Sequence, residues 1–158
     1  MGGNMVSIKS ILVPTDFSDY SKAALPYAVD IARKYGAKLY ILHIFDEELL
    51  SPIFFEVGGT AQEYFERLQD RFEAAVDDFT SGVDMTDVEF EAQLGNGTPF
   101  VEIIKFAREN GVDLIVMGTH GRTGIAHALL GSVTEKVVRK APCPVMVVRH
   151  PEFKFEMP

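Results

Sequence analysis

The sequence predicts an α/β fold, a single doubly wound domain built on a parallel sheet. Segments typical of strands and of helices alternate five times along the chain. Residues 113–117 are apolar and β-branched on both faces, as in a strand that helices cover on either side. The 158 residues, 47% of them hydrophobic and 24% charged, suit one domain with one core. We find no internal repeat and no second domain.

The first strand and helix are expected between residues 8 and 36. Residues 8–13 read as a short buried strand that Pro14 stops. Ser18 is a candidate N-cap for a helix that runs to Tyr35, with Gly36 just beyond its end. Pro26 falls inside this helix, and we expect it to kink the helix without breaking it.

The middle of the chain adds two strands and a helix. Residues 38–45 predict a second strand, and residues 46–60, with Pro52, Gly58 and Gly59, predict a long mobile loop. Apolar residues then recur every three or four positions from 65 to 79, which indicates an amphipathic helix. Residues 88–94 alternate between apolar and polar, as in a half-exposed strand near a sheet edge. Residues 95–97 (Gly-Asn-Gly) predict a turn.

The C-terminal part completes the alternation. Thr98-Pro99 begins a third helix, with Pro at the favoured first position, and Asn110-Gly111 ends it. The fourth strand follows and runs to Met117. The last helix covers residues 133–140, and the last strand Val145–Arg149.

Charge and composition exclude several function classes. The formal net charge of -8 argues against nucleic-acid binding, although residues 118–150 hold five basic residues against one acidic residue. The single cysteine, Cys143, excludes an internal disulfide and fits a reducing compartment. No apolar stretch reaches the roughly 18–20 residues of a membrane span. We therefore expect a cytoplasmic protein without nucleic-acid or membrane partners.

The most specific motif is the glycine pattern Gly118-x2-Gly121-x9-Gly131-Ser132, which follows the fourth strand. A glycine-rich loop between a parallel strand and a helix N-terminus is suited to bind a phosphate. Ser132 and Glu135 have the spacing of a capping box at the start of that helix. Neither the P-loop pattern nor G-x-G-x-x-G is present. The pattern indicates a phosphate-bearing ligand, and a nucleotide above all.

Ligands of open α/β sheets bind beyond the carboxyl ends of the strands, where the strand order reverses. The first strand is followed by Pro14-Thr15-Asp16, the second ends in His43-Ile44-Phe45-Asp46, and the fourth leads into the glycine loop. If the first and fourth strands are neighbours, Asp16 and Gly118 face one crevice.

These features resemble the ATP-binding branch of the universal stress protein family. The resemblance rests on residues 11–18, Leu42-His43-Ile44, the complete glycine motif, and Pro142-x-Pro144-Val145. It spans residues 8–149, so that we expect a domain over 5–150 and a tail over 151–158. It implies a Rossmann-like five-stranded parallel sheet in the order 3-2-1-4-5, an adenine nucleotide at the switch point, a role in the stress response, and dimers through the fifth strand.

The resemblance also implies roles for individual residues. Asp16 resembles the carboxylate that faces the ribose, and backbone groups of Ile44 would read the adenine edge. The glycines would admit the phosphates, with Arg122 near the terminal ones. The predicted nucleotide-binding residues are Pro14, Thr15, Asp16, Ile44, Met117, Gly118, His120, Gly121, Arg122, Gly131, Ser132, Val133 and Thr134.

Other interpretations of these residues stay open. Asp16 also suits a turn before the first helix, Met117 a plain core position, and Ser132 an N-cap. His120 and His127 suit a solvated loop as well as a ligand contact. Val145–Val148 is strongly apolar, and a bare apolar edge strand favours a homodimer.

The pattern favours a nucleotide-dependent switch or sensor, at most a slow ATPase. We find no P-loop lysine and no second acidic metal ligand, so no catalytic residue and no protein metal site is assigned. Mg²⁺ bridging the phosphates of ATP is compatible with Ser132, and His120 could orient a water; AMP, ADP or a cyclic nucleotide would share the adenosine site. The alternative is a dimeric interaction module in which the nucleotide is secondary. A response-regulator receiver is excluded, because Leu94-Gly95-Asn96 stands where its phosphoacceptor aspartate belongs.

Overall fold

The computed structural model describes residues 5–45, 58, 60–121 and 130–152. Its centre is a five-stranded sheet in the order β3-β2-β1-β4-β5, in which every neighbouring pair is parallel. The Rossmann-like topology and the predicted strand order are thereby confirmed. The strands are β1 (Ser10–Pro14), β2 (Lys38–Phe45), β3 (Phe90–Asn96), β4 (Leu114–Gly118) and β5 (Val145–Val148).

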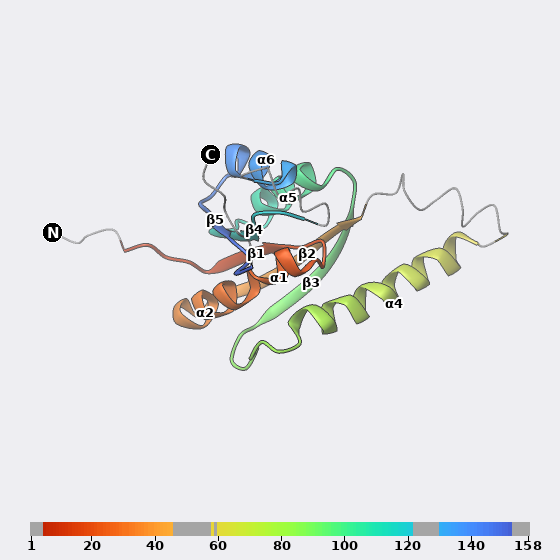
Figure 1. The fold of residues 1–158 in the computed structure, drawn as a ribbon, viewed down its shortest axis with the longest axis horizontal. Coiled ribbons are helices and arrows are strands. Elements are labelled where there is room, and N and C mark those ends of the chain that lie inside the picture. Colours follow the sequence, from red (N-terminus) through yellow and green to blue (C-terminus); the bar gives the residue numbers. More distant parts are fainter. Residues whose placement is uncertain (1–4, 46–57, 59, 122–129, 153–158) are drawn as a thin grey trace.

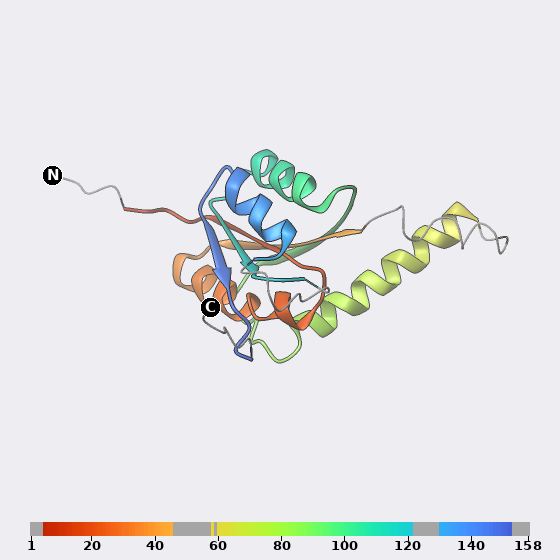
Figure 2. The ribbon, with the colours of Figure 1, turned by 45° about the horizontal axis from the view of Figure 1, so that its top comes forward.

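Helices cover both faces of the sheet. Figure 1 shows α5 (Pro99–Glu109) and α6 (Ser132–Lys140) on one face. The other face carries α2 (Leu25–Tyr35) and the C-terminal half of α4 (Ala61–Thr80), and the short α1 (Asp19–Lys22) precedes α2. The N-terminal half of α4 extends away from the sheet (Figure 2).

Successive residues of the central strands pack into two separate hydrophobic cores. On β1, Ile11 and Val13 belong to the cluster that includes α2, whereas Leu12 belongs to the cluster that includes α5 and α6. On β4, Val116 and Ile115 divide in the same way. Because side chains alternate across a strand, a strand buried on both faces must be apolar throughout. The uninterrupted apolar pattern of these strands is thus a direct consequence of the double winding.

The expected single helix from Ser18 to Tyr35 is wrong. The chain forms α1, which ends at Lys22, and a separate α2, which begins at Leu25 with Pro26 in its first turn. Proline lacks the N–H that would bond the carbonyl four residues earlier, and its ring clashes with that carbonyl. Pro26 would have met the carbonyl of Lys22, so the chain starts a new helix in which Pro26 needs no donor.

Two strand ends also differ from the prediction. β1 ends at Pro14 as predicted, but Pro14 is itself part of the strand and pairs with Leu42. The N–H of the next residue, Thr15, donates to the Leu42 carbonyl of β2, so the missing donor of Pro14 points to the opposite side, where β1 and β4 no longer pair. Gly95 and Asn96 are not in a turn: they extend β3 through pairing with Ile44 and Phe45.

Three features outside the sheet also bear on the sequence predictions. Cys143 is half-buried against the α5–α6 core, and burial, with a smaller contribution from the charge of Asp113, raises the pKa of its thiol. None of the helices in the described residues has the length and apolarity to cross a bilayer. The expected loop over 46–60 lies outside the described residues except for Gly58 and Thr60, and only Pro151 and Glu152 of the expected tail lie within them.

Candidate functional site

A pocket of about 350 Å³ lies at the carboxyl ends of β1 and β4. These two strands pair only at Ile11–Leu114 and Leu12–Ile115, and then separate. From β1 the chain continues to the face of α2, and from β4 it returns through α6 on the opposite face. The pocket therefore occupies the switch point, where open α/β sheets have their ligand sites.

The pocket brings together every predicted site residue that the structure describes. These residues are Pro14, Thr15, Asp16, Ile44, Met117, Gly118, His120, Gly121, Gly131, Ser132, Val133 and Thr134. Arg122 and His127 lie outside the described residues.

Four lining residues were not predicted: Ser21, Leu42, Pro99 and Ile103. Pro99 and Ile103 come from the first turns of α5, which packs over the carboxyl end of β2 on the same face as Leu42. Each has an ordinary role in the sequence, as a helix start or an apolar helix position. Only the placement of α5 over the sheet turns them toward the pocket.

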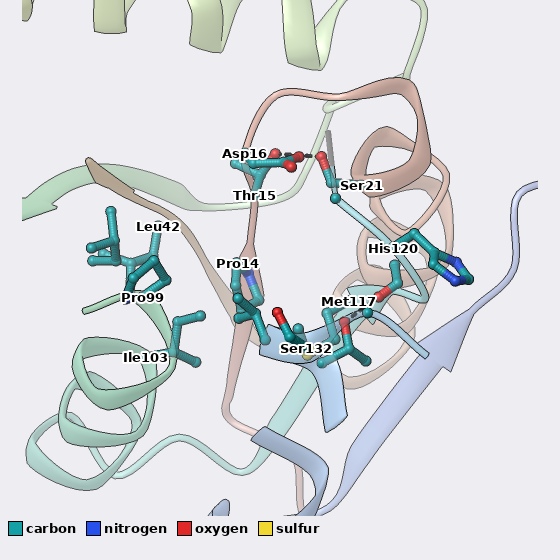
Figure 3. Close-up of a pocket in the computed structure, with 16 residues that line it drawn as sticks. Pro14, Thr15, Asp16, Ser21, Leu42, Pro99, Ile103, Met117, His120 and Ser132 are labelled. Carbon is teal, nitrogen blue, oxygen red and sulfur yellow. Dashed lines mark hydrogen bonds between the residues drawn. The ribbon is translucent and has the colours of Figure 1, made fainter. Parts of the chain in front are cut away.

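The pocket has an apolar end and a polar end. Figure 3 shows Leu42, Pro99 and Ile103 together on one side, and Ser132, with its hydroxyl, on the other beside the apolar Met117. Asp16 also lines the pocket and lies beyond Pro14, next to Thr15 (Figure 3). This arrangement suits a ligand that has an apolar part and a polar part.

A hydrogen-bond network fixes Asp16 at the β1–α1 turn. One carboxylate oxygen, Oδ1, accepts from the Ser18 N–H at 3.0 Å and from the Ser18 hydroxyl at 2.5 Å. The same hydroxyl caps α1 by accepting from the Ser21 N–H at 3.2 Å. The N-cap role of Ser18 is thereby confirmed. The second oxygen, Oδ2, faces Gly121, where a Cβ would lie 2.5 Å from it.

Thr15 and Thr134 line the pocket, but their hydroxyls form hydrogen bonds within the protein. The Thr15 N–H donates to the Leu42 carbonyl, and its hydroxyl lies 2.8 Å from that of Ser21 and accepts from the Phe17 N–H. The buried hydroxyl of Thr134 donates to the Gly118 carbonyl at 2.9 Å. The two hydroxyls therefore hold the walls of the pocket in place.

Phe17 has a left-handed backbone, with φ of 61°. Such a conformation is unfavourable for an aromatic residue unless its surroundings impose it. The ring packs against His43, Phe72 and Phe79, at centroid distances of 4.7, 6.1 and 5.8 Å. His43 donates from Nδ1 to the Thr15 carbonyl at 2.8 Å, because a carbonyl oxygen can only accept. The turn that carries Asp16 is therefore anchored on β2 and α4.

The motif glycines are needed for close approach. A Cβ on Gly118 would lie 2.5 Å from the Tyr20 carbonyl oxygen, and one on Gly131 3.2 Å from the Thr119 carbonyl oxygen. The Gly131 N–H donates to that Thr119 carbonyl at 2.7 Å, and the Thr119 N–H donates to Val148 of β5. Gly131 thus closes the loop internally, and the amides that point out of the helix end are those of the first turn of α6.

Ser132 is not the N-cap of α6. The N-cap is Gly131, whose carbonyl accepts from the Glu135 N–H at 2.9 Å, and no side chain of the described residues caps the helix. The Thr119 carbonyl holds Gly131 in the capping position, which moves Ser132 into the first turn. Its hydroxyl, free of a capping role, lines the pocket.

His120 is not a solvated loop residue. It is 4% exposed, its Nδ1 lies 3.0 Å from the Thr119 hydroxyl oxygen, and its ring packs edge-on to Tyr20. Figure 3 shows the imidazole directed away from Pro14 and Ser132. The residue contributes to the pocket wall, but its ring belongs to the packing between α1 and the glycine loop.

Fold and site define the class of protein: an open, doubly wound α/β protein of Rossmann-like topology with a pocket at the switch point. The chain belongs to the universal stress protein family, whose model matches residues 7–149. The predicted family membership is confirmed.

Related sequences and solved structures support the same family assignment. A universal stress protein of Methanocaldococcus jannaschii is 36% identical over 145 residues, which are 91% of this chain and 84% of the relative. A universal stress protein solved with cAMP is 26% identical, with a TM-score of 0.62 and coverage of 90% and 98% of the two chains. One from Archaeoglobus fulgidus, solved with dAMP, is also 26% identical, with a TM-score of 0.56 and coverage of 90% and 98%.

We predict that Ser18→Ala lowers the free energy of unfolding by about 1–2 kcal/mol, because it removes both the cap of α1 and the bonds to Asp16. Urea unfolding followed by circular dichroism measures this change in the free energy of unfolding. Ser18→Thr should retain most of the stability, and Ser7→Ala, at an exposed position, should change nothing. A Ser18→Ala protein as stable as the unsubstituted one would contradict the described network.

Proposed function

We propose that this protein binds an adenine nucleotide in the switch-point pocket, ATP in the first place, with AMP or ADP sharing the adenosine site. One observation carries the proposal: an apolar end, a fixed carboxylate and the N-terminus of α6 line a single pocket. The family relatives solved with cAMP and dAMP support it.

The arrangement gives each part of the nucleotide a partner. The base packs between Leu42 and Ile103 at the apolar end, where the backbone of Ile44 can read its edge. The ribose hydroxyls donate to Asp16, which Ser18 keeps oriented. The phosphates lie at the first turn of α6, whose amides and helix dipole favour an anion.

Mg²⁺ fits the polar end as an ion held mainly by the phosphates. It prefers oxygen ligands and keeps several waters, and the Ser132 hydroxyl can complete its shell. Within the described residues no group of three or more His, Cys, Asp or Glu could hold a metal by itself. The ion would neutralise phosphate charge, a role that Arg122 would share at the terminal phosphates.

The proposed role is a nucleotide-dependent switch or sensor of the stress response in the cytoplasm, with hydrolysis slow at most. Efficient phosphoryl transfer needs a positioned nucleophile and neutralised charge. The chain offers amides and a hydroxyl for binding, but His120, the one histidine among the described lining residues, directs its ring into packing. We therefore assign nucleotide binding, and not ATP turnover, as the role of this site.

We predict that titration calorimetry detects binding of Mg-ATP in the micromolar range and that Asp16→Ala weakens it at least tenfold, because the ribose loses its acceptor. Asp19→Ala is the matched control: this acidic residue lies three positions away, in α1 and outside the pocket, and should leave affinity unchanged. The ratio of ATP to AMP affinity reports how strongly the terminal phosphates are read. Absence of heat at millimolar ATP, from folded protein free of carried-over nucleotide, would refute the proposal.

We predict that His120→Ala leaves any slow ATP hydrolysis within about twofold of the unsubstituted rate, because the ring does not face the pocket. The melting temperature should fall, since a buried ring is lost. Phosphate release under saturating Mg-ATP measures the rate. A tenfold slower rate with unchanged ATP affinity would return His120 to a catalytic role.

A second candidate function is a dimeric interaction module, with the nucleotide secondary. The observation that favours it is β5, an edge strand on which Met146 is 38% exposed and Val145 and Val147 are half-buried. Exposed apolar edge strands tend to pair with another chain. We propose a homodimer formed through Val145–Arg149.

We predict that sedimentation at micromolar concentration gives twice the 17.5 kDa chain mass and that Met146→Lys shifts the protein toward monomer. Phe90→Lys, an equally exposed apolar position on the opposite edge strand, should leave the dimer intact. A monomer at micromolar concentration, or equal disruption by both substitutions, would refute pairing through β5.

A further inference from the structure

Gly95 lies beside Ile44 across β2 and β3, the two residues being register partners. A Cβ on Gly95 would lie 2.6 Å from Cδ1 of Ile44, well inside van der Waals contact. The Ile44 side chain therefore occupies the place where residue 95 would otherwise carry a side chain.

The conformation of Gly95 does not explain why glycine stands there. The residue is not in the left-handed region of the backbone and is in regular strand pairing, not in a turn. Glycine within a strand is otherwise unfavourable, because it adds backbone freedom to the unfolded chain and packs nothing. Position 95 requires glycine because the Ile44 side chain leaves no room for a Cβ.

That space borders the nucleotide pocket. Ile44 lines the pocket, and its strand β2 lies between β3 and β1. A group added at Gly95 would push Cδ1 away from β3 and thus toward β1, whose last residue, Pro14, lines the pocket. Cδ1 is the end of a flexible side chain, so it can yield without unfolding the sheet, and the volume lost is taken from the apolar end.

We propose that Gly95 is a specificity-determining residue of this pocket: by letting the Ile44 side chain lie over β3, it sets the width available to the base. Gly95 itself does not line the pocket and acts through Ile44. The inference rests on the proposed nucleotide function and deepens it. It places the determinant of base fit on the outer strand β3, none of whose residues lines the pocket.

The test is a double-mutant cycle read by calorimetry with Mg-ATP and with AMP. Gly95→Ala should weaken both ligands at least fivefold and by the same factor, because the base end is common to them. In the Ile44→Val background, which lacks Cδ1, the same substitution should change affinity less than twofold. Gln93→Ala is the matched control on the same face of β3. The Gln93 amide donates to Glu91, and the residue does not line the pocket. The affinity of this variant for both nucleotides should stay unchanged.

Each other outcome overturns the assignment. Unchanged affinity in Gly95→Ala, or equal losses in both backgrounds, means that the effect does not pass through Ile44. Unequal factors for ATP and AMP place it at the phosphates. A Gly95→Ala protein that does not fold shows that Ile44 cannot yield as required. If the unsubstituted protein binds neither nucleotide, the proposed function itself fails and this assignment with it, whereas binding that ignores Gly95 refutes only the assignment.

Discussion

The structure depends on the separation of two neighbouring strands. β1 and β4 are paired in register only at Leu12 and the residue before it, and beyond that point their chains run to helices on opposite faces of the sheet. Pro14 suits this opening because it has no N–H on the β4 side. Any other residue at this position would have a backbone donor there without a strand partner. The crevice is therefore a property of the topology, and the side chains only shape it.

The walls of the crevice are held by bonds that lie within the protein. Ser18 holds Asp16, the Thr134 hydroxyl reaches the Gly118 carbonyl, and the Gly131 amide reaches the Thr119 carbonyl. Each bond joins a residue at or just after the end of a strand to the start of a helix. As a result, the carboxylate and the first turn of α6 keep fixed positions relative to the sheet, which is what recognition of a small polar ligand requires.

Sequence patterns predicted the fold class and the glycine loop because both depend on local order: apolar periodicity and spaced glycines. The misassigned features depend on contacts between distant segments. Gly95 looks like part of a turn until Ile44 pairs with it, and Ser132 looks like a cap until Thr119 holds Gly131 in that place. Likewise, the burial of His120 follows from Tyr20, more than ninety residues away. The strand order came from the family resemblance and not from the periodicity.

The left-handed Phe17 has a consequence for the energetics of the loop it belongs to. Its ring is fixed by Phe72 and Phe79 of α4, a helix that contributes nothing to the lining of the pocket. The conformational entropy of the β1–α1 turn is thus lost during folding rather than on encounter with a ligand. Substitutions on α4 that loosen those rings would leave every polar contact in place and still make the site less preorganised, with the penalty appearing in the entropy of binding.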